Sequence, residues 1–152
     1  MKKSLRIMMG MTDIGFIIYW GVIWLGVIPK EYGYQDYNNE YLVDWNLSFI
    51  PLDLIISFTG LLSMYYFYKR KDSWKPLCII SLALTFSSGL QAIAFWAIRG
   101  DFSWMWWIPN LFLMLYPLYF LIDLIIGRQG ANSIHGIPRT VLEGSNSNEG
   151  TY

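Results

Sequence analysis

The chain has 152 residues, of which 55% are hydrophobic and only 14% are charged, and its formal net charge is zero. Soluble domains average about 25% charged residues, so this depletion indicates that lipid is the solvent of the chain. Zero net charge gives no basis for expecting a nucleic-acid partner. Cys78 and His135 are the single cysteine and histidine, which excludes an internal disulfide and cysteine-based zinc sites, so we expect no metal and no cofactor.

The first element is an apolar run from Ile7 to Ile28 that follows a basic start, residues 1–6. This run is too long for a signal peptide and has no small-x-small cleavage site before Pro29. It therefore predicts a retained helix over about residues 6–28. The helix should end before Pro29, because the residue before a proline resists the α conformation.

The second element, about residues 46–68, follows an acidic, tyrosine-rich segment, residues 29–45, that we expect to be a loop. The predicted helix carries one charged residue, Asp53, two positions after Pro51. A carboxyl inside a membrane helix costs about 2.5–3.5 kcal/mol at the bilayer centre and normally faces protein or water. What Asp53 faces is therefore the main question that the sequence raises.

Two further apolar runs, about residues 76–98 and 107–127, follow a basic turn and a tryptophan-rich turn. Because about 20 residues cross a bilayer core, the four runs predict an all-α, four-transmembrane-helix bundle over residues 1–127. Residues 128–152 are rich in Gly, Ser and Asn and lack apolar periodicity, which predicts a disordered tail.

Lysine and arginine are unevenly divided between the two predicted sides of the membrane. One side holds only Lys30 and Arg99, whereas the N-terminus, the turn over residues 69–75 and the start of the tail together hold eight basic residues. Cytoplasmic loops carry such an excess, so both termini are expected in the cytoplasm and the bilayer is the expected partner. The eight are Lys2, Lys3, Arg6, Lys69, Arg70, Lys71, Lys75 and Arg128.

Polar side chains on three predicted helices fall in one layer. At about 1.5 Å per residue, Asp53 and Gln91 lie about 10 Å and Asn110 about 5 Å below the outer ends of their helices. Ser57 shares the face of Asp53, and Ser88 shares the face of Gln91. The layer is either a packed polar seam or a cavity open to the outer side with Asp53 as its floor; in a third alternative Asp53 faces lipid.

A second carboxyl, Asp13, lies about 12 Å from the cytoplasmic end of the first helix. Trp20 and Trp24 share its face, and a carboxyl with aromatic walls suits an organic cation. Alternatively, the tryptophans belong to an interfacial belt and Asp13 bonds a neighbouring hydroxyl.

Three segments carry a family resemblance: Thr12-Asp13-Ile14-Gly15, Trp45 to Phe49 followed by Pro51-Leu52-Asp53, and Ser88 to Trp96. They resemble the YvaD-like family of Gram-positive bacteria, small four-helix membrane proteins of unknown function, over residues 1 to about 127. The resemblance implies a multi-pass protein of the bacterial plasma membrane and supplies no activity.

The layout also resembles, more distantly, the emopamil-binding and sigma-2 receptor class of four-helix proteins. The resemblance implies sterol-like or cationic amphiphilic ligands in an intramembrane pocket. The isomerase pattern of that class needs a histidine among glutamates, and no predicted helix contains histidine, so isomerase activity is not expected. The layout consists of Pro29 after the first helix, Asp53 in the second, Trp74 and Pro76 before the third, and Tyr116-Pro117-Leu118-Tyr119 in the fourth.

The function that the sequence favours is binding of a small hydrophobic or amphiphilic molecule in an outward-facing polar pocket. Alternatives are a small proton-coupled exporter that uses Asp13, a lipid enzyme with Asp53 and Asp13 as acid and base, and a structural or accessory membrane subunit. The sequence favours a non-enzymatic protein, and we assign no catalytic residue. The expected ligand-binding residues are Asp53, Gln91, Asn110, Asp13, Trp20, Ser57 and Ser88.

Overall fold

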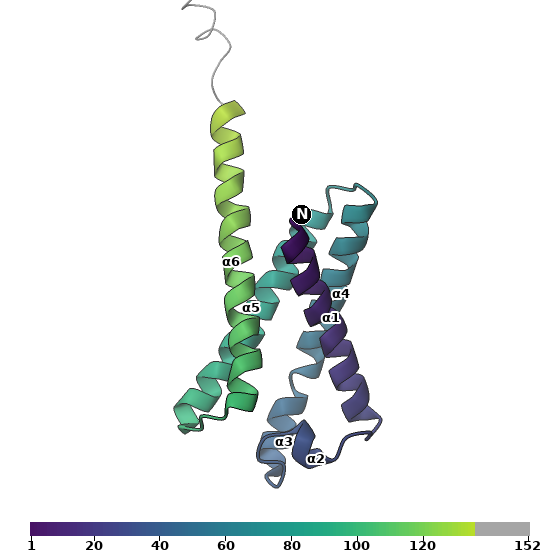
Figure 1. Cartoon of the computed structure of the whole chain (residues 1–152), viewed down its shortest axis with the longest axis vertical. Coiled ribbons are helices and arrows are strands. Elements are labelled where there is room, and N and C mark those ends of the chain that lie inside the picture. Colours follow the sequence, from purple (N-terminus) through teal and green to yellow (C-terminus); the bar gives the residue numbers. More distant parts are fainter. Residues whose placement is uncertain (136–152) are drawn as a thin grey trace, which may run out of the picture. The chain divides into compact units, whose positions relative to one another are not determined.

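The computed structural model describes residues 1–135, with the side chains of Lys30 and of residues 127–135 excepted. Every regular element in this part of the chain is a helix (Figure 1), which confirms the all-α class. Four stretches are long and apolar enough to cross a membrane, and a short helix, α2 (Lys30–Gly33), lies between the first and the second of them. These stretches are α1 (Lys3–Trp24), α3 with α4 (Glu40–Leu47 and Ile50–Tyr68), α5 (Trp74–Arg99) and the first part, Trp104–Ile126, of α6 (Trp104–His135).

Helix α1 ends at Trp24, four positions before the predicted end at Ile28. Gly26 adopts a left-handed conformation with φ 63°. Its N–H bonds the Ile23 carbonyl at 3.1 Å, and the Val27 N–H bonds the Val22 carbonyl at 3.2 Å. This is the Schellman motif, in which a glycine closes the last turn of a helix. A glycine signal, and not Pro29, therefore terminates α1.

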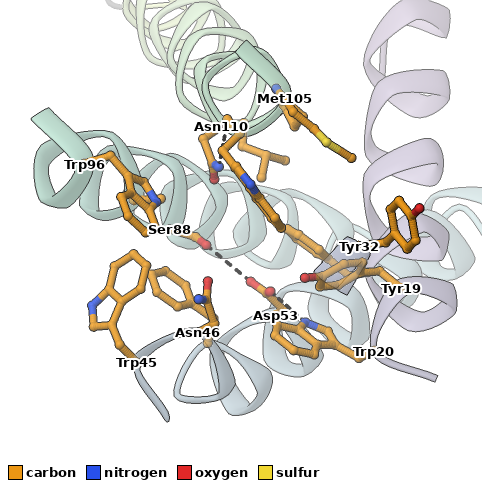
Figure 2. A pocket seen from close by; sticks show the side chains of 16 residues that line it. Tyr19, Trp20, Tyr32, Trp45, Asn46, Asp53, Ser88, Trp96, Met105 and Asn110 are labelled. Carbon is orange, nitrogen blue, oxygen red and sulfur yellow. Dashed lines mark hydrogen bonds between the residues drawn. The ribbon is translucent and has the colours of Figure 1, made fainter. Parts of the chain in front are cut away.

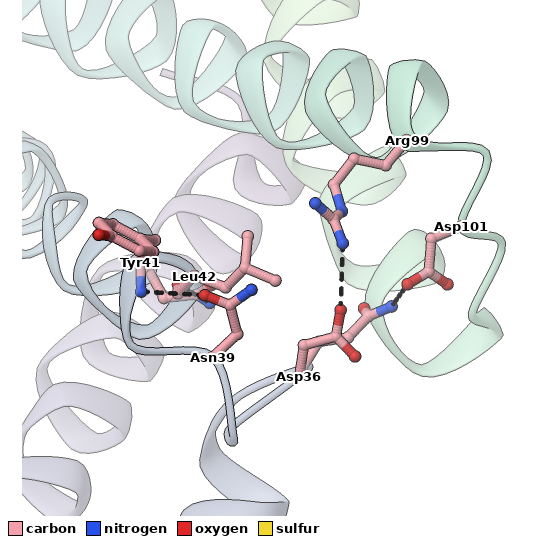
Figure 3. Close-up of polar contacts among 8 residues, drawn as sticks. Asp36, Asn39, Tyr41, Leu42, Arg99 and Asp101 are labelled. Carbon is pink, nitrogen blue, oxygen red and sulfur yellow. Dashed lines mark hydrogen bonds and ion pairs between the residues drawn. The ribbon is translucent and has the colours of Figure 1, made fainter.

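The segment that we expected to be a loop, residues 29–45, contains α2 and most of α3. Asn39 starts α3, because its side-chain oxygen accepts a hydrogen bond from the Tyr41 N–H at 3.1 Å (Figure 3). The predicted helix 46–68 is also interrupted, since α3 ends at Leu47 and α4 begins at Ile50. Pro51 accounts for the interruption, because it has no N–H to offer the Leu47 carbonyl.

Helix α6 continues to His135, beyond the predicted end at residue 127. Residues 128–135, expected in the disordered tail, are therefore helical; no proline follows Pro117 until Pro138. Residues 136–152 of the expected tail lie outside the described part of the chain. The chain divides into two compact units, Met1–Leu121 and Ile122–Tyr152, and the contacts described below lie within the first.

Helix α4 packs against both α1 and α5 (Figure 1). Large apolar side chains fill the space between them, with Leu5 and Met9 from α1, Ile56 from α4 and Leu82 from α5 all buried. Small residues line the seams, as is common where membrane helices approach closely. They are Ser57, Gly60 and Ser63 on α4 and Ser81, Ser88 and Gly89 on α5.

The outward faces of the four long stretches carry large apolar side chains. Such a surface would be an aggregation hazard in water, whereas lipid tails cover it without cost. The surface therefore agrees with the low charge content of the chain. Exposed examples are Ile7, Met11, Ile14, Ile17 and Ile18 on α1, Leu54, Ile55 and Phe58 on α4, Ile80 and Leu90 on α5, and Ile108, Phe112 and Leu115 on α6.

Candidate functional site

Asp53 lies in the first turn of α4 and is only 4% exposed. The indole Nε1 of Trp20 donates a hydrogen bond to its Oδ2 at 2.8 Å, and the Ser88 hydroxyl donates to its Oδ1 at 3.3 Å (Figure 2). Side chains from α1 and α5 thus hold the carboxyl from opposite sides. The burial of Asp53 rules out the alternative in which it faces lipid.

Local structure explains why a carboxyl is tolerated at this position of α4. Pro51 suits the first turn of α4, where a backbone N–H has no acceptor within the helix. Asp53 follows in the same turn, where the positive end of the helix dipole favours a carboxylate. Trp20 is held from its other side by an edge-to-face contact with Tyr19, whose hydroxyl donates to the Gly33 carbonyl at 2.8 Å.

A cavity of about 300 Å³ adjoins the Asp53 carboxyl (Figure 2). Binding pockets for small molecules typically have a mainly apolar, aromatic lining with few polar groups, and this lining has that character. Its aromatic residues are Phe16, Tyr19, Trp20, Tyr32, Trp45, Phe49, Trp96 and Trp106, and its polar side chains are Asn46, Asp53, Ser88 and Asn110.

Two tryptophans that sequence reasoning had not placed at the site form part of the wall. Trp45 of α3 stacks on Phe95 of α5, with ring centroids 3.9 Å apart and an interplanar angle of 17°. Trp45 also meets Trp96 edge to face at 5.7 Å. These contacts attach α3 to α5. Both tryptophans lie at helix ends, where a sequence signal for the interfacial belt and one for a cavity wall look alike.

The two amides of the cavity belong to α3 and α6. Asn46 donates to the Leu42 carbonyl at 2.8 Å, and Asn110 donates to the Trp106 carbonyl at 2.7 Å. Gly89 sets the position of Asn110, because a Cβ at Gly89 would lie 2.7 Å from the Asn110 carbonyl oxygen. The structure therefore brings Asn110 and Asp53 to one cavity, as the depth argument predicts.

Gln91 does not join them, since its side chain is exposed and is not part of the cavity lining. Each residue turns a helix by about 100°, so Gln91 lies about 80° around the axis from Ser81 and Ala92 only about 20°. Ala92 and Ser88 accordingly occupy the buried face of α5. The expectation that Gln91 is a neighbour of Asp53 is wrong, and Ser88 makes that contact instead.

Ser57 and Asp13 lie behind the cavity and are not part of its lining. The Ser57 hydroxyl lies 3.0 Å from the Asp13 carbonyl and 2.9 Å from the Asp53 carbonyl. Asp13 is 1% exposed, and its carboxyl faces Gly60. Its Oδ2 and the Thr12 hydroxyl are buried without a hydrogen-bond partner among the described residues. Trp24, expected beside Asp13, is 84% exposed.

Polar contacts tie the segment before α3 to the turn between α5 and α6. The Arg99 guanidinium pairs with Asp36 at 3.4 Å (Figure 3). Gln35 donates to the Asp101 carboxylate at 2.6 Å. Tyr32, from the same segment, is part of the cavity lining. The segment thereby contributes Tyr32 to the wall of the cavity.

Four apolar helical stretches of membrane length, with a buried carboxyl beside an aromatic cavity, define the class of this protein as a small helical protein with an internal polar site. The chain belongs to the family of unknown function DUF5360, which matches residues 5–131. It is similar to the uncharacterized protein YvaD of Bacillus subtilis (strain 168), with 41% identity over 119 residues, or 78% of this chain and 90% of that protein.

These matches confirm the resemblance to the YvaD-like family. No solved structure matches the chain. The more distant resemblance to the emopamil-binding and sigma-2 receptor class stays a prediction.

Proposed function

We propose that this protein spans the bacterial plasma membrane four times, with its N-terminus in the cytoplasm, and binds a small amphiphilic molecule in the Asp53 cavity. The observation that carries the proposal is a carboxyl only 4% exposed that adjoins a cavity of about 300 Å³ with mostly aromatic walls. The polar head of the ligand meets Asp53, and its apolar part meets the aromatic walls.

Charge supports this placement of the head. No lysine or arginine belongs to the cavity lining among the described residues. The carboxyl receives hydrogen bonds from Trp20 and Ser88, which are neutral donors. A ligand that brings a donor or a positive charge to Asp53 therefore supplies what the protein itself does not, and the ring faces favour a cation as well.

An apolar groove between α1 and α6 supports the placement of the tail. The groove has a volume of about 240 Å³, and its lining includes Met11, Gly15 and Phe112. Met11 and Phe112 are also exposed on the apolar outer surface of the helices. Phe16, Pro109 and Leu113 belong to the lining of both groove and cavity. An amphiphile in the cavity can therefore extend its tail toward lipid past these three side chains.

The alternatives receive less support from the geometry. An exporter that uses Asp13 needs this carboxyl to be reachable during transport, and Asp13 is buried against Gly60 away from the cavity. An acid–base pair of Asp13 and Asp53 needs both groups at one substrate, whereas only Asp53 belongs to the cavity lining. An accessory subunit does not require a hollow lined by aromatic side chains.

The proposal is tested with two probes that share a tail and differ in the head, dodecylamine and dodecanol. Each is added to the purified protein in nanodiscs of zwitterionic lipid, and heat unfolding is followed by intrinsic fluorescence. We expect at least one probe to raise the midpoint of the wild type, by about 2–4 °C for each kcal/mol of binding free energy. Asp53→Asn should reduce that rise at least by half.

Asp44→Asn is the matched control, because it makes the same chemical change at an exposed carboxyl of α3 outside the cavity lining. This variant should keep the full rise. The proposal is overturned if neither probe raises the midpoint of the wild type, or if both variants respond alike.

A further inference from the structure

A second hollow, of about 410 Å³, lies at the end of the protein that carries the N-terminus of α1 and the turn between α4 and α5. Its lining consists of Arg6 of α1, Phe67 and Tyr68 at the end of α4, Arg70 of the turn, and Trp74 at the start of α5. Among the residues that the structure describes, two arginines and no acidic residue belong to the lining. The hollow is independent of the Asp53 cavity and shares no residue with it.

Aromatic rings hold the Arg6 side chain in place. Its guanidinium carbon lies 5.3 Å from the ring centre of Phe67 and 5.7 Å from that of Tyr68. One terminal nitrogen donates to the Tyr68 hydroxyl at a long 3.4 Å, and Nε is buried without a hydrogen-bond partner among the described residues. A guanidinium has five N–H donors, so Arg6 is positioned by its stacking and retains donors for another acceptor.

Arg70 enters the hollow from the turn. Its backbone is left-handed, with φ 55°, and hydrogen bonds from the Arg70 N–H to the Phe67 carbonyl and from the Lys71 N–H to the Tyr66 carbonyl close the end of α4. This closure directs the chain back toward α5 within a few residues. It brings the second arginine to the same hollow as Arg6.

The surroundings of the hollow are positive. The turn carries Lys71 and one acidic residue, Asp72, and Lys75 follows in the first turn of α5. Neither α1 nor α5 has an acidic residue in its first turn, so the basic residues outnumber the acidic one. The pKa of the Met1 amino group is lowered from its ordinary value, first by burial and second by the charge of Arg6. An anion is therefore the ligand that this end of the protein favours.

We propose that the hollow binds the phosphate group of an anionic phospholipid, with Arg6 and Arg70 as the ligating side chains. Paired guanidinium groups match the oxygens of a phosphate, and tryptophan and tyrosine suit the depth of lipid head groups. The site lies at the ends of α1, α4 and α5, where membrane-length helices leave the hydrocarbon region. The lipid is the source that these positions favour over free phosphate.

Native mass spectrometry of the detergent-purified protein tests the proposal with phosphatidylglycerol and phosphatidylcholine as probes. We expect the wild type to retain phosphatidylglycerol at least about tenfold more strongly than phosphatidylcholine. Replacing both Arg6→Gln and Arg70→Gln should remove most of this preference.

The matched control replaces Lys71→Gln in the turn and Lys75→Gln at the start of α5, which removes the same amount of positive charge at the same end of the protein but outside the hollow. It should change retention less than about twofold. Equal losses in the two double variants would show diffuse attraction to basic residues and overturn the site. A third arm adds inorganic phosphate at millimolar concentration, and displacement of the lipid by it would overturn the lipid as the source.

A conservative variant covers the case in which the double arginine variant does not fold. Arg6→Lys keeps the positive charge and an aliphatic stem against the rings but loses the planar fork of donors. We expect an unchanged unfolding midpoint and a several-fold loss of phosphatidylglycerol retention. Full retention by Arg6→Lys would contradict ligation by the guanidinium.

Discussion

Asp13 and Asp53 are both buried carboxyls, but their surroundings differ in kind. Asp53 receives hydrogen bonds from two neighbouring helices and adjoins an open volume. Asp13 faces the backbone of Gly60, and one of its oxygens has no hydrogen-bond partner among the described residues. At the scale of single residues, one carboxyl lines a cavity and the other contributes to the contact between α1 and α4.

Gly60→Ala tests the contact between Asp13 and α4. A Cβ at residue 60 would lie 2.7 Å from the Asp13 carboxyl carbon, so the helices must separate or the carboxyl must move. Overpacking of this kind costs about 1–3 kcal/mol. We expect a lower midpoint of heat unfolding in detergent micelles.

Gly15→Ala is the control for this change, because a Cβ at residue 15 meets nothing within 4 Å. It should be neutral or stabilising by up to about 1 kcal/mol through helix propensity. The double variant Asp13→Ala with Gly60→Ala should cost less than the sum of the single changes, because the clash needs the carboxyl. Additive costs would mean that the two residues do not interact.

Single-residue predictions from the sequence succeeded where depth alone decides and failed where rotation around a helix decides. Asp53 and Asn110 could be placed in one layer from their distance to the helix ends. Gln91 could not, because steps of three and four residues accumulate an angular error of about 80° over ten residues. The hydrogen bond from Trp20 to Asp53 depends on which helices are neighbours, and helical runs alone do not show this.

At the scale of elements, α6 approaches α5 closely at Gly89. A Cβ at Gly89 would lie 2.7 Å from two backbone atoms of α6, the Asn110 oxygen and the Met114 nitrogen. Backbone atoms cannot rotate away as a side chain does. The absence of a side chain at residue 89 is therefore a condition for this helix pair and for the place of Asn110 in the cavity.

Gly89→Ala is expected to destabilise the protein more than Gly60→Ala, because α6 must shift as a whole. The measurement is again the midpoint of heat unfolding in micelles. Gly21→Ala serves as the control, since nothing lies within 4 Å of a Cβ there, and helix propensity alone should then act, by up to about 1 kcal/mol. A midpoint for Gly89→Ala equal to that of Gly21→Ala would refute the close approach.

The existence of the long helices could be predicted from apolar runs, whereas several of their ends could not. Gly26 ends α1 by a hydrogen-bond motif that lies inside the apolar run. The helices α2 and α3 begin in a polar, tyrosine-rich segment without apolar periodicity. The formation of α3 depends on the Asn39 cap and on the stacking of Trp45 on Phe95. Such local chemistry and tertiary contacts override composition.

At the scale of the whole molecule, charge divides the two ends of the first compact unit. Arg6, Lys69, Arg70, Lys71 and Lys75 lie around the turn between α4 and α5 and the start of α1. The opposite end carries an acidic segment that includes Glu31, Asp36, Glu40 and Asp44. This asymmetry is the physical basis for the proposed orientation in the membrane.

The orientation is tested with single cysteines at exposed positions, Asn38→Cys and Asp72→Cys, because Cys78 is fully buried. A membrane-impermeant maleimide added to intact cells should label the variant at residue 38 and leave the variant at residue 72 unlabelled. After the cells are opened, both should react. Labelling of residue 72 alone in intact cells would establish the reverse orientation.

The break before Pro51 divides the wall of the cavity between two helices. Trp45 and Asn46 of the cavity wall belong to α3, whereas Asp53 belongs to α4. With no N–H at Pro51 to bind the Leu47 carbonyl, α3 is not continued by the backbone hydrogen bonds of α4, and its position depends on its contacts with α5. A substitution on α3 that leaves the stacking of Trp45 on Phe95 intact can therefore change the shape of this wall without moving the Asp53 carboxyl.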